Sequence, residues 1–260
     1  MLVEIEELYG GYGSGDICQG ISFGVNKGEI ISVLGPNGCG KTTLFRLLLG
    51  SLTPTGGSIR IGGSSTLKMP KKELAKLIAY IPQYHTPAFA YSVLEVVMMG
   101  RVSHLSPLEN PREADREKAF QALETLQIIH LANSRYTALS GGQRQMVLIA
   151  RAICQDAGIL VMDEPGASLD YANQQLLMDT IVTLAGQGYS IILSTHSPEH
   201  PFSIAHQVLL LNQGRTAAFG PPETAITGPV LEQVYGIEME VITMHDRYGK
   251  KHTMCIPVSR

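Results

Sequence analysis

The chain has 260 residues, of which 44% are hydrophobic and 17% charged, so it can bury a substantial core without disulfides. Its net charge of −3 at pH 7 provides no basic field that would draw the whole chain to nucleic acid. The four cysteines, Cys18, Cys39, Cys154 and Cys255, show no C-x-x-C spacing, as expected in a reducing cytoplasm. Composition therefore favours one domain over residues 1–260 and argues against a nucleic-acid-binding or disulfide-rich protein.

The residues predict neither export nor membrane insertion. Acidic side chains occur within residues 1–7, where a secretory signal would need a basic segment followed by a long apolar one. Apolar runs such as residues 159–162 and 208–211 are far shorter than the ~20 residues that a membrane helix needs. We therefore expect a chain that does not itself span a membrane.

The first third of the chain predicts strands around a single helix. Apolar and polar residues alternate around glycines over residues 2–23, which indicates a small antiparallel sheet, and a short strand pair is expected near residues 58–61. An apolar run over residues 77–82 ends at a proline and predicts a buried strand. Gln83 follows this strand directly.

From about residue 87 to 157 the pattern becomes helical. The clearest helix is expected at residues 112–129, with Pro111 at its start and apolar residues at helical spacing. This stretch predicts a helical insert within the domain.

Short apolar strands return after the insert. They lie at residues 159–162, 191–194 and 208–211 and are separated by helix-length segments such as residues 171–186, which is typical of a parallel α/β sheet. A hairpin that turns near residues 246–249 is expected over residues 238–258.

These expectations divide the domain into three parts. They are a core over about 1–86 and 158–235, a helical subdomain over about 87–157, and a C-terminal hairpin over about 236–260.

The most informative segment follows the apolar residues 30–34 and precedes a helix-like run at residues 44–49. It carries the pattern G-x-x-x-x-G-K-[ST], in which glycines and a helix N-terminus direct backbone N–H groups at phosphates. Lys41 would reach the β and γ phosphates, and Thr42 would supply a hard oxygen ligand for Mg²⁺. The predicted phosphate loop consists of Gly35, Pro36, Asn37, Gly38, Cys39, Gly40, Lys41, Thr42 and Thr43.

Two carboxylates end the apolar run at residues 159–162. In α/β sheets this edge of the strands binds ligands. Asp163 can hold Mg²⁺ through water, and Glu164 can act as the general base for the attacking water. The pair is weak evidence by itself and becomes informative together with the phosphate loop.

A second candidate anion site follows Leu139. Ser140 is expected to cap a helix that runs through Met146 and Ile153, and the glycines after it leave the first N–H groups of that helix accessible. The segment consists of Ser140, Gly141, Gly142 and Gln143.

Leu-Ser-Gly-Gly-Gln is the signature of the ATP-binding cassette (ABC) ATPases, and the sequence resembles that family over nearly its full length. The resemblance implies an α/β fold, with a P-loop NTPase (RecA-like) core, an antiparallel β subdomain and a helical insert that carries the signature. It matches Gln83 to a residue that senses Mg²⁺ and water, Asp170 to a loop at a dimer interface, and His196 to a switch histidine that contacts the γ phosphate.

For the adenine the resemblance points to an aromatic platform near the N-terminus. Tyr12 is the expected residue, with Tyr9 as a neighbouring alternative. Gly166 and Ser197 depart from the threonine and aspartate that are common in the family, but neither position carries chemistry, so an active ATPase is expected. The pair His196 and His200 lacks a third ligand at convincing spacing and does not predict a metal site.

The resemblance also implies partners. Two copies would form a homodimer that sandwiches two ATP molecules with Mg²⁺, each site using the phosphate loop of one copy and the Ser140 helix end of the other. A separate membrane permease would dock beside Gln83, with residues 84–89 as the candidate contact, and a periplasmic or surface substrate-binding protein would take part indirectly. The chain would lie at the cytoplasmic face of the inner membrane.

Three segments, at residues 91–101, 168–174 and 230–237, resemble importers of iron chelates, haem and cobalamin, a group that also includes molybdate and tungstate importers. The cargo itself is not determined by any residue of this chain. A soluble cassette ATPase that acts on nucleic acid or the ribosome is the alternative, although such proteins usually carry two cassettes or basic extensions. An inactive regulatory cassette would need a defective Lys41, Glu164 or His196, and all three are intact.

Overall fold

The computed structural model describes residues 1–13, 15–83, 89–106 and 109–258. A six-stranded sheet forms its centre, with strand order β10-β9-β3-β8-β7-β6. Its neighbouring strands are parallel except for the β9–β10 pair. The strands are β3 (Ile30–Leu34), β6 (Ile78–Ile81), β7 (Ile159–Met162), β8 (Ser190–Thr195), β9 (Gln207–Asn212) and β10 (Arg215–Gly220).

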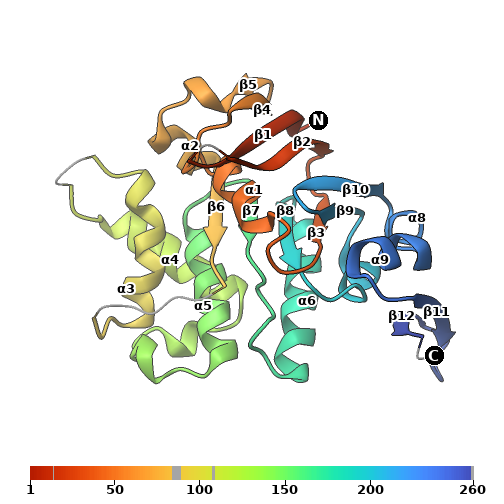
Figure 1. Ribbon diagram of the computed structural model, residues 1–260. Helices are drawn as coiled ribbons and strands as arrows, with labels where there is room; N and C mark the ends of the chain where they lie inside the picture. Colours follow the sequence, from red (N-terminus) through yellow and green to blue (C-terminus); the bar gives the residue numbers. More distant parts are fainter. Residues whose placement is uncertain (14, 84–88, 107–108, 259–260) are drawn as a thin grey trace.

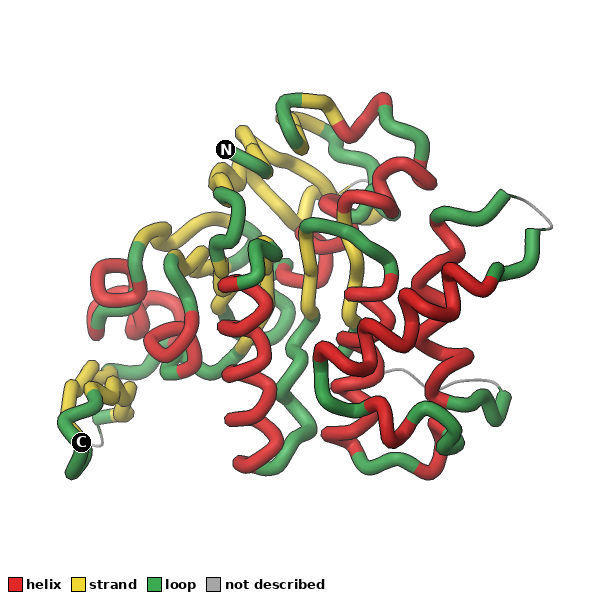
Figure 2. Tube along the Cα trace, turned by 180° about the vertical axis from the view of Figure 1, so that it is seen from behind, coloured by secondary structure: helices red, strands yellow, loops and turns green. Residues whose placement is uncertain are grey.

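Alternating side chains on these strands bury both faces of the sheet. Ile31 and Val161 point into one core cluster, which also contains residues of α1 (Lys41–Leu48). Ala79 and Met162 point into the opposite cluster, with residues of α5 (Gly141–Cys154). The predicted α/β class is confirmed, and the sheet lies between two helical or mixed layers (Figures 1 and 2).

The predicted N-terminal strands join one antiparallel sheet with the order β2-β1-β4-β5. This sheet lies on the α1 side of the centre (Figure 1). A Cβ added to Gly10 would lie 2.6 Å from Leu47 Cδ2, so the first strand passes close over α1. The strands are β1 (Val3–Tyr12), β2 (Gly15–Val25), β4 (Gly56–Ile61) and β5 (Ser64–Ser65).

The helical part packs on the other side of the central sheet (Figure 2). Its predicted long helix begins one residue later than expected and ends at Thr125, before a separate 3₁₀ turn. A buried ion pair, Arg101 Nε to Asp115 Oδ1 at 2.9 Å, joins two of its segments. The remaining helices before β8 are α2 (Lys71–Leu77), α3 (Val93–Met98), α4 (Glu113–Thr125) and α6 (Tyr171–Gly186).

The C-terminal part packs near the β10–β9 edge of the central sheet, where Val208 and Leu210 of β9 share a core cluster with its helices. The predicted hairpin is present, with strands joined through residues 246–250. The side chain of Glu199 connects it to the loop after β8, because its carboxylate accepts from Ser197 Oγ at 2.7 Å and from Cys255 N at 3.4 Å. The elements are α7 (His200–Ile204), α8 (Pro222–Ala225), α9 (Gly228–Tyr235), β11 (Met239–His245) and β12 (Lys251–Pro257).

Across the described part of the chain, no helix has both the length and the apolar character needed to cross a membrane.

Candidate active site

The phosphate loop joins the carboxyl end of β3 to the first residue of α1. Gly40 precedes the helix with a φ of 111°, in the left-handed region that favours glycine. A Cβ added to Gly35 would lie 2.5 Å from the Leu211 carbonyl oxygen, so a larger residue would force the loop away from β9. The sequence therefore fixes the loop directly at the N-terminus of α1, where backbone N–H groups are free to bind an anion.

Lys41 folds back over this loop. Its Nζ donates to the carbonyl oxygens of Gly35 at 2.7 Å and Pro36 at 3.2 Å, and lies 3.5 Å from Glu164 Oε1. The side chain is only 6% exposed. The loop carbonyls and the Glu164 carboxylate thus hold the ammonium group inside the loop.

Hydroxyl groups from three elements surround the Asp163 carboxylate. Ser194 Oγ donates to Oδ1 at 2.7 Å, while Thr42 Oγ1 and Tyr80 OH donate to Oδ2 at 3.3 and 3.4 Å. These donors come from β8, α1 and β6 respectively. Burial and the neighbouring Asp163 carboxylate raise the pKa of Tyr80 to about 12. Asp163 and Thr42, two of the three residues predicted for the Mg²⁺ site, are therefore brought together, whereas Gln83, the third, is not among these contacts.

Glu164 occupies a strained backbone position next to this cluster. Its φ is 43°, in the left-handed region that a β-carbon disfavours, and its N–H donates to Ser194 Oγ at 2.8 Å. Its carboxylate lies between Lys41 and His196, with His196 Nδ1 at 3.1 Å from Oε2. The predicted base, lysine and switch histidine thus form one chain of contacts.

His196 follows β8 and remains more than half exposed, so it can reach a ligand outside the fold. His200 lines the same cavity but contacts a different group: its Nδ1 lies 3.3 Å from Thr195 Oγ1, and burial lowers the pKa of this imidazole. Within the described ranges, no group of three or more His, Cys, Asp and Glu residues could hold a metal ion. A cavity of about 250 Å³ is lined by both Glu164 and His196 and has room for water beside them.

Ser140 caps α5, as expected. Its Oγ accepts from Gln143 N at 3.3 Å, and its N–H donates to Gln143 Oε1 at 3.0 Å, which together form a capping box. This first turn lies against α6, since a Cβ added to Gly142 would clash with the Asn173 side chain. Both hydrogen bonds of the capping box stay within the first turn of the helix.

Asp170 caps the neighbouring helix α6. Its Oδ1 accepts from Asn173 N at 2.9 Å, and both carboxylate oxygens accept from Asn173 Nδ2. Hydrogen bonds from Asn173 hold the pKa of Asp170 below its usual value. The two helix ends that carry Asp170 and Ser140 are thus neighbours on one surface.

Tyr12 and Tyr9 differ in their surroundings. Tyr12 OH accepts from Arg46 Nη1 at 2.7 Å, and the guanidinium carbon lies 5.6 Å from the ring centre, so Tyr12 stands beside α1. Tyr9 packs against the antiparallel sheet, with its ring 3.4 Å from the position of a Cβ on Gly56. Both rings are partly exposed, but only Tyr12 is tied to the helix that follows the phosphate loop.

Gln83 ends the described segment after β6. The candidate permease contact at residues 84–89 lies outside the described residues except for Phe89. That ring is 67% exposed and packs edge-on against Tyr91, with centroids 5.8 Å apart.

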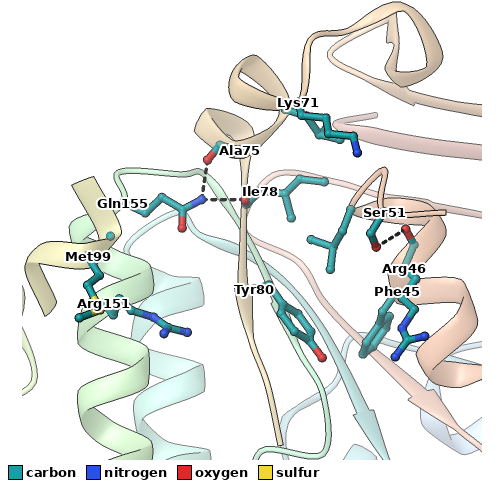
Figure 3. Close-up of a pocket in the computed structure, with 13 residues that line it drawn as sticks. Phe45, Arg46, Ser51, Lys71, Ala75, Ile78, Tyr80, Met99, Arg151 and Gln155 are labelled. Carbon is teal, nitrogen blue, oxygen red and sulfur yellow. Dashed lines mark hydrogen bonds between the residues drawn. The ribbon is translucent and has the colours of Figure 1, made fainter. Parts of the chain in front are cut away.

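A groove of about 560 Å³ lies between α1, α2, β6 and α5. Figure 3 shows Arg46 of α1 on one side of β6 and Arg151 of α5 on the other. Gln155 closes one end by donating to the Ile78 carbonyl at 2.9 Å. Its basic side chains are Arg46, Lys71 and Arg151, and no acidic residue is among the described residues that line it.

Sequence reasoning missed three residues of this region. They are Ser194, Tyr80 and Arg46, which match no motif. Each was found through a hydrogen bond in the folded chain, the first two to Asp163 and the third to Tyr12. Strand alternation could have placed Ser194 and Tyr80 on the sheet, but not the partner of either hydroxyl.

All four cysteines are free and buried. Burial raises the pKa of the Cys39 thiol within the phosphate loop, although nearby Lys41 opposes this shift. Burial and this shift both disfavour reaction of the Cys39 thiol with alkylating agents.

A glycine loop after one parallel strand, paired carboxylates after a second and a histidine after a third define a P-loop nucleoside triphosphatase. The family model described as "ABC transporter" matches residues 18–167, more than half of the chain. The protein therefore belongs to the ABC transporter family, and it is an ATPase of the kind that powers transport.

Similar proteins extend the match over almost the whole chain. The molybdate import ATP-binding protein MolC of Haemophilus influenzae is 39% identical, over 86% of this chain and 83% of that protein. The hemin import ATP-binding protein HmuV of Pseudomonas entomophila is 35% identical, over 92% and 94%. A solved ABC transporter of metal-chelate type, in an inward-facing conformation, has a TM-score of 0.89 and 35% identity and covers 100% of this chain and 98% of its own.

Proposed function

We propose that this chain is the ATP-hydrolysing subunit of an importer that takes up a metal chelate (an iron chelate, haem or cobalamin) or an oxyanion such as molybdate or tungstate. The main observation in support of ATP hydrolysis is the series of contacts from Lys41 to Glu164 to His196 beside the glycine loop. The printed names of the relatives, hemin import and molybdate import, support the two cargo classes. The chelate class is further supported by the similar solved transporter of metal-chelate type.

In the proposed reaction, water attacks the γ phosphate of ATP and releases ADP and phosphate. The backbone of the glycine loop and the α1 N-terminus bind the phosphates, while Lys41 leaves the loop carbonyls to neutralise their charge. Glu164 accepts the proton of the attacking water. His196, which contacts Glu164 at 3.1 Å, holds that carboxylate in place and contacts the γ phosphate.

The donors present fit Mg²⁺, since the Thr42 hydroxyl and the Asp163 carboxylate are hard oxygen ligands already within 3.3 Å of each other. We assign the metal to these two residues, with Gln83 as the side chain that senses it and the attacking water. When bound, the ion would neutralise charge on the phosphates.

We further propose that two copies close around two ATP molecules. The capping-box hydrogen bonds of Ser140 stay within the first turn of α5, which leaves the first N–H groups of this helix available to a phosphate bound by a second copy. Ser140, Gly141, Gly142 and Gln143 would complete that site, with Asp170 beside them at the interface. Tyr12 would stack on the adenine.

The permease is proposed to dock in the groove of Figure 3, which is continuous with the strand before Gln83. Its basic lining favours a segment that carries acidic side chains. In this arrangement the chain would lie on the cytoplasmic face of the inner membrane, and a periplasmic or surface binding protein would deliver the cargo to the permease.

The test is co-purification from the native inner membrane, followed by reconstitution of the isolated complex in lipid vesicles. We expect a partner with many membrane helices, and ATP-dependent uptake of a labelled iron chelate, haem, cobalamin, molybdate or tungstate. The Glu164→Gln complex is the matched control and should not accumulate cargo. Recovery with ribosomes or DNA and no membrane chain would contradict the proposal.

A further inference from the structure

Tyr80 belongs to two sites at once. Its ring is half-buried on β6 and forms part of the wall of the 560 Å³ groove. Its hydroxyl donates to Asp163 Oδ2 at 3.4 Å. Figure 3 shows the ring between the α1 side and the α5 side of the groove.

The register of the central sheet produces this double contact. Tyr80 pairs with Val161 on the adjacent parallel strand β7. Because side chains alternate, Asp163, two residues beyond Val161, continues on the face that Tyr80 and α1 share. A tyrosine is long enough to line the groove with its ring and still place its hydroxyl on the carboxylate.

The other contacts of the carboxylate make the Tyr80 hydroxyl important. Ser194 holds Oδ1, whereas Oδ2 is shared between Thr42 and Tyr80. The Thr42 oxygen is the proposed Mg²⁺ ligand, so a hydroxyl committed to the metal would no longer orient Asp163. Tyr80 would then be the remaining described donor to Oδ2.

We propose that Tyr80 is a positioning residue that couples occupancy of the groove to the metal-binding carboxylate of Asp163. This inference rests on the proposed function, since it presupposes the Mg²⁺ site. A segment seated in the groove presses on the Tyr80 ring, shifts its hydroxyl and thereby changes how Asp163 Oδ2 is presented. The route runs through the folded sheet and is separate from the segment after Gln83.

The first experiment removes the hydroxyl and keeps the ring. Mn²⁺ binding is measured by electron paramagnetic resonance of the free ion, with a non-hydrolysable ATP analogue present. Tyr80→Phe should weaken Mn²⁺ binding by about three- to tenfold, as the loss of one hydrogen bond of ordinary net strength implies. Binding of the metal-free nucleotide, measured in EDTA, should remain within twofold of the unmodified protein.

Tyr189→Phe is the matched control, because Tyr189 is a half-buried tyrosine that does not line the groove. It should bind Mn²⁺ like the unmodified protein. Equal Mn²⁺ affinity in Tyr80→Phe and Tyr189→Phe, with both variants folded, would overturn the positioning role.

The second experiment fills the groove. Ser51 is an exposed lining residue, whereas the four native thiols are buried, so a bulky maleimide should react selectively with Ser51→Cys. Labelling should change Mn²⁺ affinity at least threefold when Tyr80 is present and leave it unchanged in Ser51→Cys/Tyr80→Phe. An equal effect in both backgrounds, or no effect in either, would contradict the coupling.

These outcomes separate the inference from the proposed function. If the unmodified protein fails to bind Mn²⁺ with the nucleotide analogue, the metal site itself is wrong. If it binds, but neither Tyr80→Phe nor the label changes the affinity, only the role of Tyr80 is wrong.

Discussion

The phosphate-loop region and the Ser140 helix end are built in contrasting ways. Around the loop, side chains from α1, β6, β7 and β8 contact one another through Lys41, Asp163 and Glu164. At the helix end, Ser140 hydrogen-bonds within its own first turn, through Gln143. One region is therefore assembled from several elements of a single chain, whereas the other is a capped helix end that needs no further element of the same chain to form.

The largest effect is expected when the proposed general base of the phosphate-loop region is removed. Glu164→Gln should lower the ATPase rate by about 10²–10⁴-fold, because the proton acceptor is lost while the phosphate contacts remain. ATP should then hold two copies together, which size-exclusion chromatography with and without ATP measures. A variant that hydrolyses ATP at the original rate would remove Glu164 from its role.

The next effect tests the outward-facing region. Ser140→Arg places a bulky side chain at the helix end and should reduce ATPase activity by about 10²-fold, since donors to the phosphate are blocked. Lys41→Ala should also be inactive, because it cannot bind the nucleotide. Steady-state phosphate release measures both variants.

Mixing these two inactive variants provides the sharpest test. In a mixed pair, the Ser140→Arg copy supplies an intact phosphate loop and the Lys41→Ala copy supplies an intact Ser140 helix end. These two parts form one complete site, so the mixture should regain ATPase activity. Each variant alone, at the same total concentration, is the control. Without recovery, the sandwich of two copies would be wrong.

A smaller effect is expected at Ser194, which supports the assembled region from β8. Ser194→Ala removes the donor of the buried hydrogen bond to Asp163 Oδ1 and the acceptor of the partly buried one from Glu164 N–H. Loss of these partners should cost about 1–3 kcal/mol of stability, measured by urea unfolding. Ser190→Ala, at the other end of β8, is a comparison that should leave the ATPase rate unchanged, whereas Ser194→Ala should lower it.

The two tyrosines near the loop offer a matched pair. Tyr12→Ala should weaken nucleotide binding by about tenfold, since stacking on one base contributes about 1–3 kcal/mol. Tyr9→Ala should affect binding by less than twofold, because its ring packs on the antiparallel sheet. Titration with a fluorescent ATP analogue measures both variants, and a reversed order would assign the adenine to Tyr9.

The smallest effect concerns the cap at Asp170. The folded-state pKa lies below the usual 3.8 because the ionised form accepts hydrogen bonds from Asn173. The contribution of this carboxylate to folding stability is therefore fully present above pH 3.8, and it is lost as the pH falls through the lower pKa of the folded state. Between pH 5 and pH 3 the melting temperature of the unmodified protein should drop slightly more than that of Asp170→Asn. Asparagine can cap the helix as well, but it has no proton to gain in this range. Parallel slopes in scanning calorimetry would contradict this.

Much of both regions could be predicted from sequence because local patterns determine them. The phosphate loop, the strand before Asp163 and the Ser140 cap each depend on neighbouring residues. The hydroxyl contacts of Asp163 could not be predicted, because Tyr80 and Ser194 are 83 and 31 residues away along the chain and meet it only through sheet register. The end of the helix expected at residues 112–129 was also missed, since Gln127 adopts a φ of 59° that breaks the helix.

The carboxylate of Glu199 links the C-terminal hairpin to the loop that carries His196, the proposed switch histidine. One of its oxygens accepts from Ser197, next to His196, and the other accepts from Cys255 on the last strand. Proteolytic nicking in the turn at residues 246–250 would loosen that strand and remove one support of the loop after β8. Two preparations with identical nucleotide-contacting residues could therefore differ in turnover because of the integrity of a distant surface turn.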